Sequence, residues 1–297
     1  MELLDGRVAS AAIQEDLKQK ISLLAKDQKA PHLAAILVGN DPASETYVNS
    51  KVKNCKETGI TSSLFRLEES ITEEELLKKI EELNQQPEIN GILVQLPLPK
   101  HISEKNVINA ISPLKDVDGF HPVNVGNMVL GFPGFISATP LGIMLMLKHY
   151  KIETSGKNVV VIGRSNIVGT PMSLLLSRNN DQGNATVTLC HSRTKNLKEI
   201  CLSADIIVAA IGRSNFVTAD MVKENAVVID VGINRVPDST KKKGYALKGD
   251  VDFENVAPKS SYITPVPGGV GLMTIAALLN NTYDAFLRQE EAGKNQA

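Results

Sequence analysis

The sequence has no excess of charge of either sign, with 32 Lys and Arg residues against 33 Asp and Glu residues in a chain of 297. Without a net positive field the chain has no general attraction for nucleic acid or for an anionic membrane surface, so we expect a small-molecule partner. Long apolar runs are also missing. The longest one near a helix, LGIMLML at 141–147, is far shorter than the ~20 residues that cross a bilayer, so we expect no membrane span.

Cysteine is scarce as well. Cys55, Cys190 and Cys201 are an odd number, lie far apart and form no C-x-x-C motif, which is typical of buried thiols in a reducing compartment. The first residues, MELLDGRVAS, carry acids and no apolar run before a small-residue cleavage site, so we expect no secretory or mitochondrial signal and a cytoplasmic location. The five histidines show no paired ligand spacing, and we expect no metal.

What the sequence does contain is typical of a compact globular protein, with 42% hydrophobic and 22% charged residues. Its length predicts about two domains. In the first half, helical patterns alternate with short apolar runs, and Asp41 followed by Pro42 predicts the start of a helix. This alternation is typical of an α/β fold with a parallel sheet. The expected helices are 6–27, 42–57 and 72–83, and the expected strands are 34–39, 63–67 and 91–99.

Residues 115–140 are rich in Gly, Pro and Asn, which predicts a domain junction lined by loops. A helix at 139–150 follows, and a last helix is expected at 270–288. Between them lie five short β-branched runs, separated as in a doubly wound nucleotide-binding fold. These runs are 158–163, 185–190, 205–212, 226–232 and 262–265.

The first of these runs leads into a glycine loop, VVVIGRSNIVGTP at 159–171. Gly163 and Gly169 stand between an apolar strand and the mouth of a helix, where backbone N–H groups and the helix dipole can hold a pyrophosphate. The pattern differs from G-x-G-x-x-G because Ser165 occupies the second glycine position, so this motif alone is weakly specific.

The second run ends in residues that favour NADP over NAD. NAD enzymes usually carry an Asp or Glu there for the ribose 2′-hydroxyl, whereas this run leads into His191, Ser192, Arg193 and Thr194. A cation and hydroxyls suit a 2′-phosphate, and Arg164 of the glycine loop lies on the same edge of a doubly wound sheet. The alternative is that both arginines are ordinary surface charges.

A second set of polar residues suggests chemistry in the first half of the chain. Tyr47 and Lys51 are four residues apart on an expected helix and share one face, although such a pair is more often a ring packed on an aliphatic stem. Gln95 is the sole polar side chain in VQLPLP, at the end of a strand, where α/β sheets bind ligands. Asp116 and Asp118 follow in KDVDG.

Six motifs, in one order, resemble the methylenetetrahydrofolate dehydrogenase/cyclohydrolase family from about residue 2 to residue 288. They are Y-V-N-S-K, V-Q-L-P-L-P, K-D-V-D-G-F, G-R-S-N-I-V-G-T-P, C-H-S-R-T and T-P-V-P-G-G-V-G. The resemblance implies oxidation of 5,10-methylenetetrahydrofolate by NADP and hydrolysis of the methenyl product to 10-formyltetrahydrofolate. It also implies a homodimer that serves one-carbon metabolism and purine biosynthesis.

The resemblance implies an N-terminal α/β catalytic domain, residues 1–139 with helix 272–292, and a Rossmann-type NADP-binding domain, residues 140–271, with a cleft between them. It assigns catalysis to Lys51, Gln95, Tyr47 and Asp118, with Gln95 tuning the lysine. Further folate contacts would come from Tyr47, Leu96, Asp118, Pro267, Gly268 and Gly269. Cofactor contacts would come from Gly163, Arg164, Ser165, Val168, Gly169, Ser192, Arg193, Ile233 and Thr274.

Elementary chemistry agrees with the role of the lysine. Hydride departure leaves a cation on the one-carbon bridge, so a neutral Lys51, desolvated and held by the Gln95 oxygen, is favoured over a charged one. That amine can then assist attack by water. Asp118 suits the N–H donors of a pterin, whereas Asp116 better suits a loop cap. One alternative is a dehydrogenase without the hydrolytic step. The other is an inactive nucleotide-sensing module, and such a module would be expected to lack Lys51 or Gln95.

Two features depart from the family pattern. Leu272 stands where family members commonly have proline after the glycine run, and the segment at 178–187 is several residues longer than usual. The sequence leaves open whether a cis bond precedes Pro265 or Pro267, as well as the relative rates of the two reactions and the preferred polyglutamate length.

Overall fold

The computed structural model describes residues 1–24, 29–241 and 244–294. The chain divides into two compact units, Met1–Ala11 with Thr139–Thr274 and Ala12–Ala138 with Ile275–Ala297. We call the first the Thr139 unit and the second the Ala12 unit, and each is described by itself. The division falls at residue 139, where the sequence analysis places the domain boundary, and the contacts of residues 1–11 group them with the Thr139 unit. Their strand β1 (Glu2–Leu3) pairs with β11 (Tyr262–Ile263) of the same unit.

The Ala12 unit is built on a parallel sheet of three strands in the order β3-β2-β4. Its strands are β2 (His32–Val38), β3 (Thr61–Leu67) and β4 (Gly91–Val94). The side chains of central β2 alternate between two cores: Leu33 packs on one face, and Ala34 and Ile36 pack on the other. The carboxyl ends of β2 and β4 lie at the same edge because the strands are parallel, with Ile36 opposite Val94.

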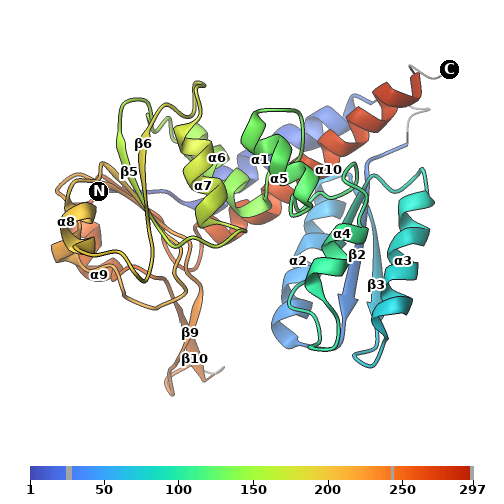
Figure 1. Cartoon of the computed structure of the whole chain (residues 1–297), viewed down its shortest axis with the longest axis horizontal. Coiled ribbons are helices and arrows are strands. Elements are labelled where there is room, and N and C mark those ends of the chain that lie inside the picture. The colour runs from blue at the N-terminus through green and yellow to red at the C-terminus, as the bar shows by residue number, and fades with distance from the viewer. Residues whose placement is uncertain (25–28, 242–243, 295–297) are drawn as a thin grey trace. The chain divides into compact units, whose positions relative to one another are not determined.

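Helices cover both faces of this sheet. They are α1 (Gly6–Ser22), α2 (Pro42–Thr58), α3 (Glu73–Gln85), α4 (Glu104–Ala110), α5 (Pro122–Leu130) and α10 (Val270–Lys294). Residues of α1, α2 and α10 share one core, and residues of α3 and α4 share the other, so α2 and α3 flank the strands (Figure 1). The expected first helix ends earlier than predicted, at Ser22, and residues 25–27 of that prediction lie outside the described residues.

Helix α2 carries part of the candidate site and begins where the sequence predicts. The Asp41 side chain accepts a hydrogen bond from the backbone N–H of Ser44 at 2.8 Å, and Pro42 occupies the first turn. The helix ends at Gly59, whose φ of +87° suits glycine. These caps fix the first and last residues of α2. They therefore also fix the positions of its side chains, Tyr47 and Lys51 among them, along the helix axis.

The segment expected to consist of loops contains α5. This prediction was wrong over 122–130 because valine, asparagine and glycine there have low helix propensity, and the local pattern did not indicate a helix. An N-cap and a buried side-chain hydrogen bond hold the helix instead. His121 Nδ1 accepts from the backbone N–H of Val123 at 3.1 Å, and buried Asn124 donates to Asp116 at 2.9 Å.

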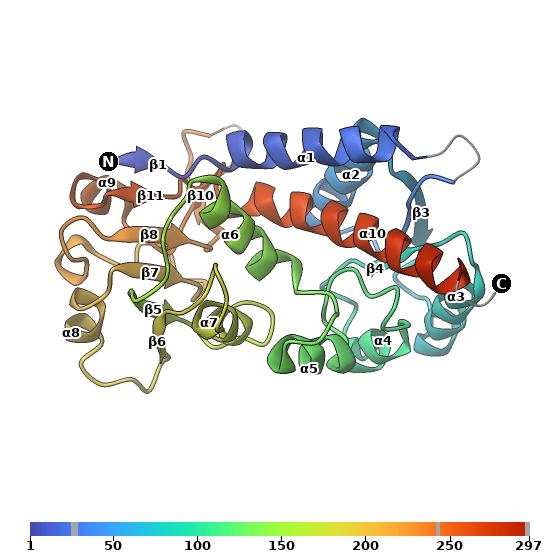
Figure 2. The same ribbon diagram turned by 90° about the horizontal axis from the view of Figure 1, so that it is seen from above.

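The Thr139 unit contains a parallel six-stranded sheet in the order β1-β11-β8-β7-β5-β6 (Figure 2). Besides β1 and β11 its strands are β5 (Asn158–Ile162), β6 (Thr186–Cys190), β7 (Ile206–Ala209) and β8 (Val227–Asp230). The five expected strands are confirmed, and β1 is the one that the sequence did not predict. The chain runs from β5 out to β6 and then returns to β7 on the other side of β5, so the sheet has a switch point between β5 and β7.

The remaining elements of the Thr139 unit lie around this sheet. The helices are α6 (Ala138–His149), α7 (Gly169–Ser177), α8 (Leu197–Leu202) and α9 (Phe253–Val256), with 3₁₀ turns at Ala219–Met221 and Ala257–Lys259. Strands β9 (Asn234–Pro237) and β10 (Tyr245–Lys248) form an antiparallel hairpin that extends from the sheet (Figure 1). One face of the sheet packs against residues of α8 and α9, so the strands lie against a buried hydrophobic core.

Candidate active site

Lys51 and Gln95 form a hydrogen-bonded pair in the Ala12 unit. Lys51 lies on α2 and is only 6% exposed. Its Nζ donates to Oε1 of Gln95 at 3.1 Å. Gln95 directly follows β4, and its Nε2 donates to the carbonyl oxygen of Leu96 at 2.6 Å. The amide is therefore oriented with its oxygen toward the amine.

The surroundings of Lys51 favour its neutral form. Burial lowers the pKa of the Lys51 amine, although the negative charge of Asp118 opposes this effect. The Tyr47 ring lies one helical turn away, with its centroid 5.7 Å from Nζ. Burial raises the pKa of the Tyr47 hydroxyl, which keeps that group protonated. The result is an amine that loses its proton more readily than an ordinary lysine, beside an uncharged aromatic face.

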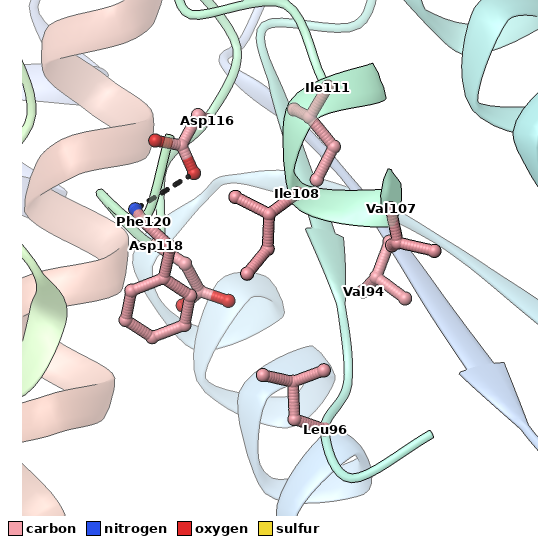
Figure 3. Close-up of a pocket in the computed structure, with 8 residues that line it drawn as sticks. All are labelled: Val94, Leu96, Val107, Ile108, Ile111, Asp116, Asp118 and Phe120. Carbon is pink, nitrogen blue, oxygen red and sulfur yellow. Dashed lines mark hydrogen bonds between the residues drawn. The ribbon is translucent and has the colours of Figure 1, made fainter. Parts of the chain in front are cut away.

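Asp118 lines a small pocket in the same unit. Figure 3 shows the Asp116 and Asp118 carboxylates at one side and aliphatic side chains at the other. Burial raises the pKa of the Asp118 carboxyl to about 6, with the Lys51 charge acting in the opposite direction. The other residues of the lining are Val94, Leu96, Val107, Ile108, Ile111 and Phe120. A carboxylate beside an apolar wall suits a flat heterocycle with N–H donors at one edge.

The aliphatic wall of this pocket was not predicted from the sequence. Val107, Ile108 and Ile111 come from α4 and the residue after it, for which no helix was predicted. Their one- and four-residue spacing is compatible with one side of a helix, and Ser103 before α4 accepts from the backbone N–H of Asn106 at 3.4 Å. The Ser103 cap and the spacing of these aliphatic residues are the sequence features that could have predicted α4.

Asp116 holds the loop that carries Asp118. Its carboxylate accepts from the backbone N–H groups of Phe120 at 3.3 Å and His121 at 2.8 Å. This is the capping role that the sequence predicts for Asp116. Gly119 has a φ of +71°, and a Cβ there would lie 2.5 Å from the backbone nitrogen of Ser137. Only glycine fits this turn, so the loop is tightly specified.

In the Thr139 unit, the glycine loop after β5 forms a close turn. A Cβ at Gly163 would lie 2.1 Å from the carbonyl oxygen of Ala210, and a Cβ at Gly169 would lie 1.9 Å from that of Gly163. Ser165 Oγ accepts from the backbone N–H of Val168 at 3.2 Å. The space that a side chain would fill is thus taken by backbone, and the loop leads directly into α7.

The turn after β6 places two predicted cofactor residues at the surface. Ser192 and Arg193 are exposed, as is Arg164 of the glycine loop. The turn itself is fixed by two hydrogen bonds: His191 N–H donates to Thr194 Oγ1 at 2.8 Å, and Arg193 N–H donates to His191 Nδ1 at 3.1 Å. The exposed arginine and serine side chains can therefore face a bound anion.

The other predicted residues also lie in the Thr139 unit. Ile233 is 50% exposed after β8, and Thr274 lies in the first turns of α10, with its Oγ1 3.2 Å from that of Thr139. The segment Pro267–Gly269 belongs to this unit rather than to the one with Lys51. The bond before Pro267 is cis and the bond before Pro265 is trans, which answers the question that the sequence left open. A cis bond also precedes Pro97.

The described residues, 1–24, 29–241 and 244–294, lack the features of a metal site and of a membrane span. In those ranges no cluster of three or more His, Cys, Asp or Glu residues could hold a metal ion. Within the same part of the chain, no helix combines the length and the apolar character that crossing a bilayer requires.

Known proteins match the chain over nearly its whole length. The family model of the tetrahydrofolate dehydrogenase/cyclohydrolase catalytic domain matches residues 4–118, and the model of the NAD(P)-binding domain of the same family matches residues 137–290. The chain belongs to the tetrahydrofolate dehydrogenase/cyclohydrolase family. The resemblance inferred from six sequence motifs is confirmed, and the chain carries the NAD(P)-binding domain of this family.

Two relatives from the tetrahydrofolate dehydrogenase/cyclohydrolase family are similar in sequence to this chain across both units. The bifunctional protein FolD of Cytophaga hutchinsonii is 60% identical over 286 residues, which are 96% of this chain and 99% of that protein. The FolD protein of Porphyromonas gingivalis is 58% identical over 282 residues, 95% of each chain. The sequence is therefore similar to bifunctional enzymes throughout.

Solved structures of the same family share the fold. The FolD dehydrogenase/cyclohydrolase of Campylobacter jejuni has a TM-score of 0.91 and 51% identity, covering 97% of this chain and 99% of that one. The FolD enzyme of Trypanosoma brucei, described as complexed with NADP cofactor and an inhibitor, has a TM-score of 0.90 and 38% identity and covers 96% of each chain. The predicted α/β class, with a catalytic and a doubly wound NAD(P)-binding part, is confirmed.

Proposed function

We propose that the chain is a bifunctional enzyme that oxidises 5,10-methylenetetrahydrofolate with NADP and hydrolyses the methenyl product to 10-formyltetrahydrofolate. Membership of the family supports both reactions. The observation that carries the proposal for this chain is the buried Lys51 amine, hydrogen-bonded to Gln95 and electrostatically coupled to Asp118. We assign the amine to both steps.

In the oxidation, the role of Lys51 is to avoid adding positive charge. Loss of hydride from the one-carbon bridge leaves a cation delocalised over N5, the bridging carbon and N10. An ammonium beside it would repel that charge, so the lowered pKa of Lys51 favours the step. Gln95 accepts one N–H of the amine and so keeps its lone pair available on another side. Gln95 is a positioning residue in this scheme.

In the hydrolysis, Lys51 moves protons. The neutral amine takes a proton from a water molecule as the oxygen of that water bonds to the methenyl carbon. When the bond from this carbon to N5 breaks, the ammonium returns a proton to N5, and the hydroxyl on the carbon loses its proton to become the formyl oxygen. Cation and water thus yield 10-formyltetrahydrofolate and one proton, and Lys51 ends as it began.

Asp118 and Tyr47 orient the folate. The ionised Asp118 carboxylate accepts from the 2-amino group and the ring N–H of the pterin, a paired contact that fixes direction as well as affinity. Tyr47 stacks on the aromatic surface of the folate. Leu96 of the pocket wall completes the proposed folate contacts of the Ala12 unit.

NADP fits the Thr139 unit because a tight glycine loop follows β5 and leads directly into the N-terminus of α7, as in doubly wound dinucleotide-binding folds. Bound NADP supplies the acceptor for the hydride. Gly163, Arg164, Ser165, Val168 and Gly169 would hold its pyrophosphate, since backbone N–H groups gather there at the start of α7. Ser192 and Arg193 would hold the 2′-phosphate, and Ile233 and Thr274 would surround the nicotinamide.

The preference for NADP gives a direct prediction. We expect kcat/KM with NADP to exceed kcat/KM with NAD by about tenfold or more, because Arg193 forms a charge-assisted contact only with the 2′-phosphate. Replacing Arg193 with alanine should reduce efficiency with NADP and leave efficiency with NAD unchanged. Equal or better use of NAD by the wild type, in steady-state assays with both cofactors, would contradict the assignment.

The pKa of Asp118 predicts a pH dependence of folate binding. Only the ionised carboxylate accepts two N–H groups, so affinity is full well above the pKa of about 6 and is lost as the pH falls through it. We expect the Kd of a stable folate ligand to rise about tenfold per pH unit below that value. The Asp118→Asn variant, titrated with the same ligand, corrects for ionisation of the ligand itself. A wild-type profile parallel to that of this variant would rule out Asp118 as the titrating group.

Three wider features belong to the same proposal. We infer that the Ala12 unit binds folate and that the Thr139 unit binds NADP. We infer a homodimer that pairs through the edge of the sheet at β6, because an edge strand has unpaired backbone groups along one side. A cytoplasmic location is supported by the free thiols Cys55, Cys190 and Cys201, which suit a reducing compartment.

A further inference from the structure

Asp250 is a fully buried carboxylate in the Thr139 unit that the proposed reactions do not use. Its exposed fraction is 0%, and it follows β10. Oδ2 accepts from the backbone N–H groups of Ile211 at 2.6 Å and Gly212 at 2.9 Å. Oδ1 accepts from the backbone N–H of Arg213 at 2.8 Å and from Asn234 Nδ2 at 2.9 Å. Both oxygens are thus fully occupied as acceptors.

These donors lie at the edge of the sheet where a doubly wound fold binds its dinucleotide. Ile211, Gly212 and Arg213 follow β7, which neighbours β5 at the switch point. The start of their loop touches the glycine loop, because a Cβ at Gly163 would lie 2.1 Å from the Ala210 carbonyl oxygen. The loop that Asp250 holds is therefore a direct neighbour of the loop proposed to hold the pyrophosphate.

A second hydrogen-bond set fixes Asp250 itself. Asp230, 3% exposed at the end of β8, accepts from the backbone N–H of Asp250 at 2.8 Å and of Val251 at 2.9 Å. The Asp250 carboxylate packs closely against the backbone after β8, since a Cβ at Gly232 would lie 2.3 Å from Asp250 Oδ1. Asn234 also connects this carboxylate to the segment after β8, which contains Ile233. One side chain thus joins the ends of two strands.

We propose that Asp250 is a positioning residue for NADP, which sets the shape of the loops after β7 and β8 without touching the cofactor. The inference rests on the proposed function. Three successive N–H groups that converge on one point would otherwise attract an anion, and the internal carboxylate satisfies them and fixes the backbone. An amide cannot replace this carboxylate. In an Asp250→Asn variant the NH₂ group of the new side chain would face two N–H donors, whichever way the amide were turned.

The test is the Asp250→Asn variant, which keeps the size of the side chain and removes two acceptor contacts. We expect the Kd of NADP, measured by titration calorimetry, and the KM of NADP to rise about tenfold or more. The cyclohydrolase reaction consumes no NADP and should stay within about twofold of wild type. Asp220→Asn is the matched control, because Asp220 is exposed in the same unit and pairs with Lys198; it should bind NADP as the wild type does.

Other outcomes would overturn the role of Asp250. These are unchanged NADP binding in the folded variant, or an equal loss of both activities, which would indicate general damage to the fold. Should Asp250→Asn not fold, Asn234→Ala removes one donor only and should raise the Kd of NADP about threefold with hydrolysis unchanged; no rise would refute the proposal. If the wild-type protein failed to bind NADP, the proposed function itself would be contradicted. If the wild type catalysed both reactions and Asp250→Asn bound NADP equally well, only the positioning role of Asp250 would be contradicted.

Discussion

Lys51→Met is expected to lower the rate of methenyl hydrolysis by a factor of roughly 100 to 10,000, the usual contribution of general acid and base catalysis. Methionine keeps the length and the apolar stem of lysine, so α2 should remain packed, while the group that takes and returns the proton is lost. The dehydrogenase step should be impaired to a smaller extent, because methionine adds no positive charge but breaks the hydrogen bond between positions 51 and 95 that holds this part of the proposed folate site. Both rates are measured by following absorbance, with methenyltetrahydrofolate alone or with methylenetetrahydrofolate and NADP.

The same helix provides a control for Lys51. Lys53 has a side chain that is 73% exposed and pairs with Glu57 four residues on. Lys53→Met makes an identical chemical change at the surface and should leave both reactions near wild type, since exposed pairs of this kind contribute little. Hydrolysis near the wild-type rate in folded Lys51→Met would remove this lysine from the mechanism.

Asp118→Ala is expected to raise the KM for folate about a hundredfold, as two hydrogen bonds to a charged acceptor are lost together. The KM for NADP should stay near wild type, because the proposed cofactor residues belong to the other unit. Steady-state assays that vary one substrate at a time measure the two constants. Hydrolysis of methenyltetrahydrofolate needs no NADP and should show the same increase in KM.

Asp16 is a suitable control for the Asp118 variant. Its side chain is 59% exposed on α1 and pairs with Lys20, so Asp16→Ala removes a carboxylate of the same unit without touching the pocket. Both KM values should then be unchanged. If Asp118→Ala raised the two KM values equally, the effect would be one of folding, and Asp118 would lose its assigned role.

The parts of the fold with a strong local signal could be predicted from the sequence. Asp41 and Pro42 mark the start of α2 by cap chemistry alone, and the β-branched runs around 158–163 and 226–232 match β5 and β8 to within two residues. The juxtaposition of Lys51 and Gln95 also follows from local rules. One lies on a helix after β2 and the other at the carboxyl end of β4, and parallel strands bring those ends together.

The parts fixed by distant contacts could not be predicted. The two residues of β1 have no pattern of their own, and only pairing with β11, which lies far along the chain, makes them a strand. Helix α5 depends on Asp116 and Asn124 rather than on propensity. Asp250 was missed for the same reason, because its four donors come from two other strand ends that the sequence does not connect.

Both proposed reactions can be followed in one assay, in which wild-type protein is supplied with methylenetetrahydrofolate and NADP and the amounts of NADPH, the methenyl compound and 10-formyltetrahydrofolate are quantified over time. We expect NADPH and 10-formyltetrahydrofolate to form in equal amounts while the methenyl compound stays low. Methenyltetrahydrofolate that accumulates in proportion to NADPH would indicate a dehydrogenase without hydrolytic activity, and a failure to form NADPH would contradict the account as a whole.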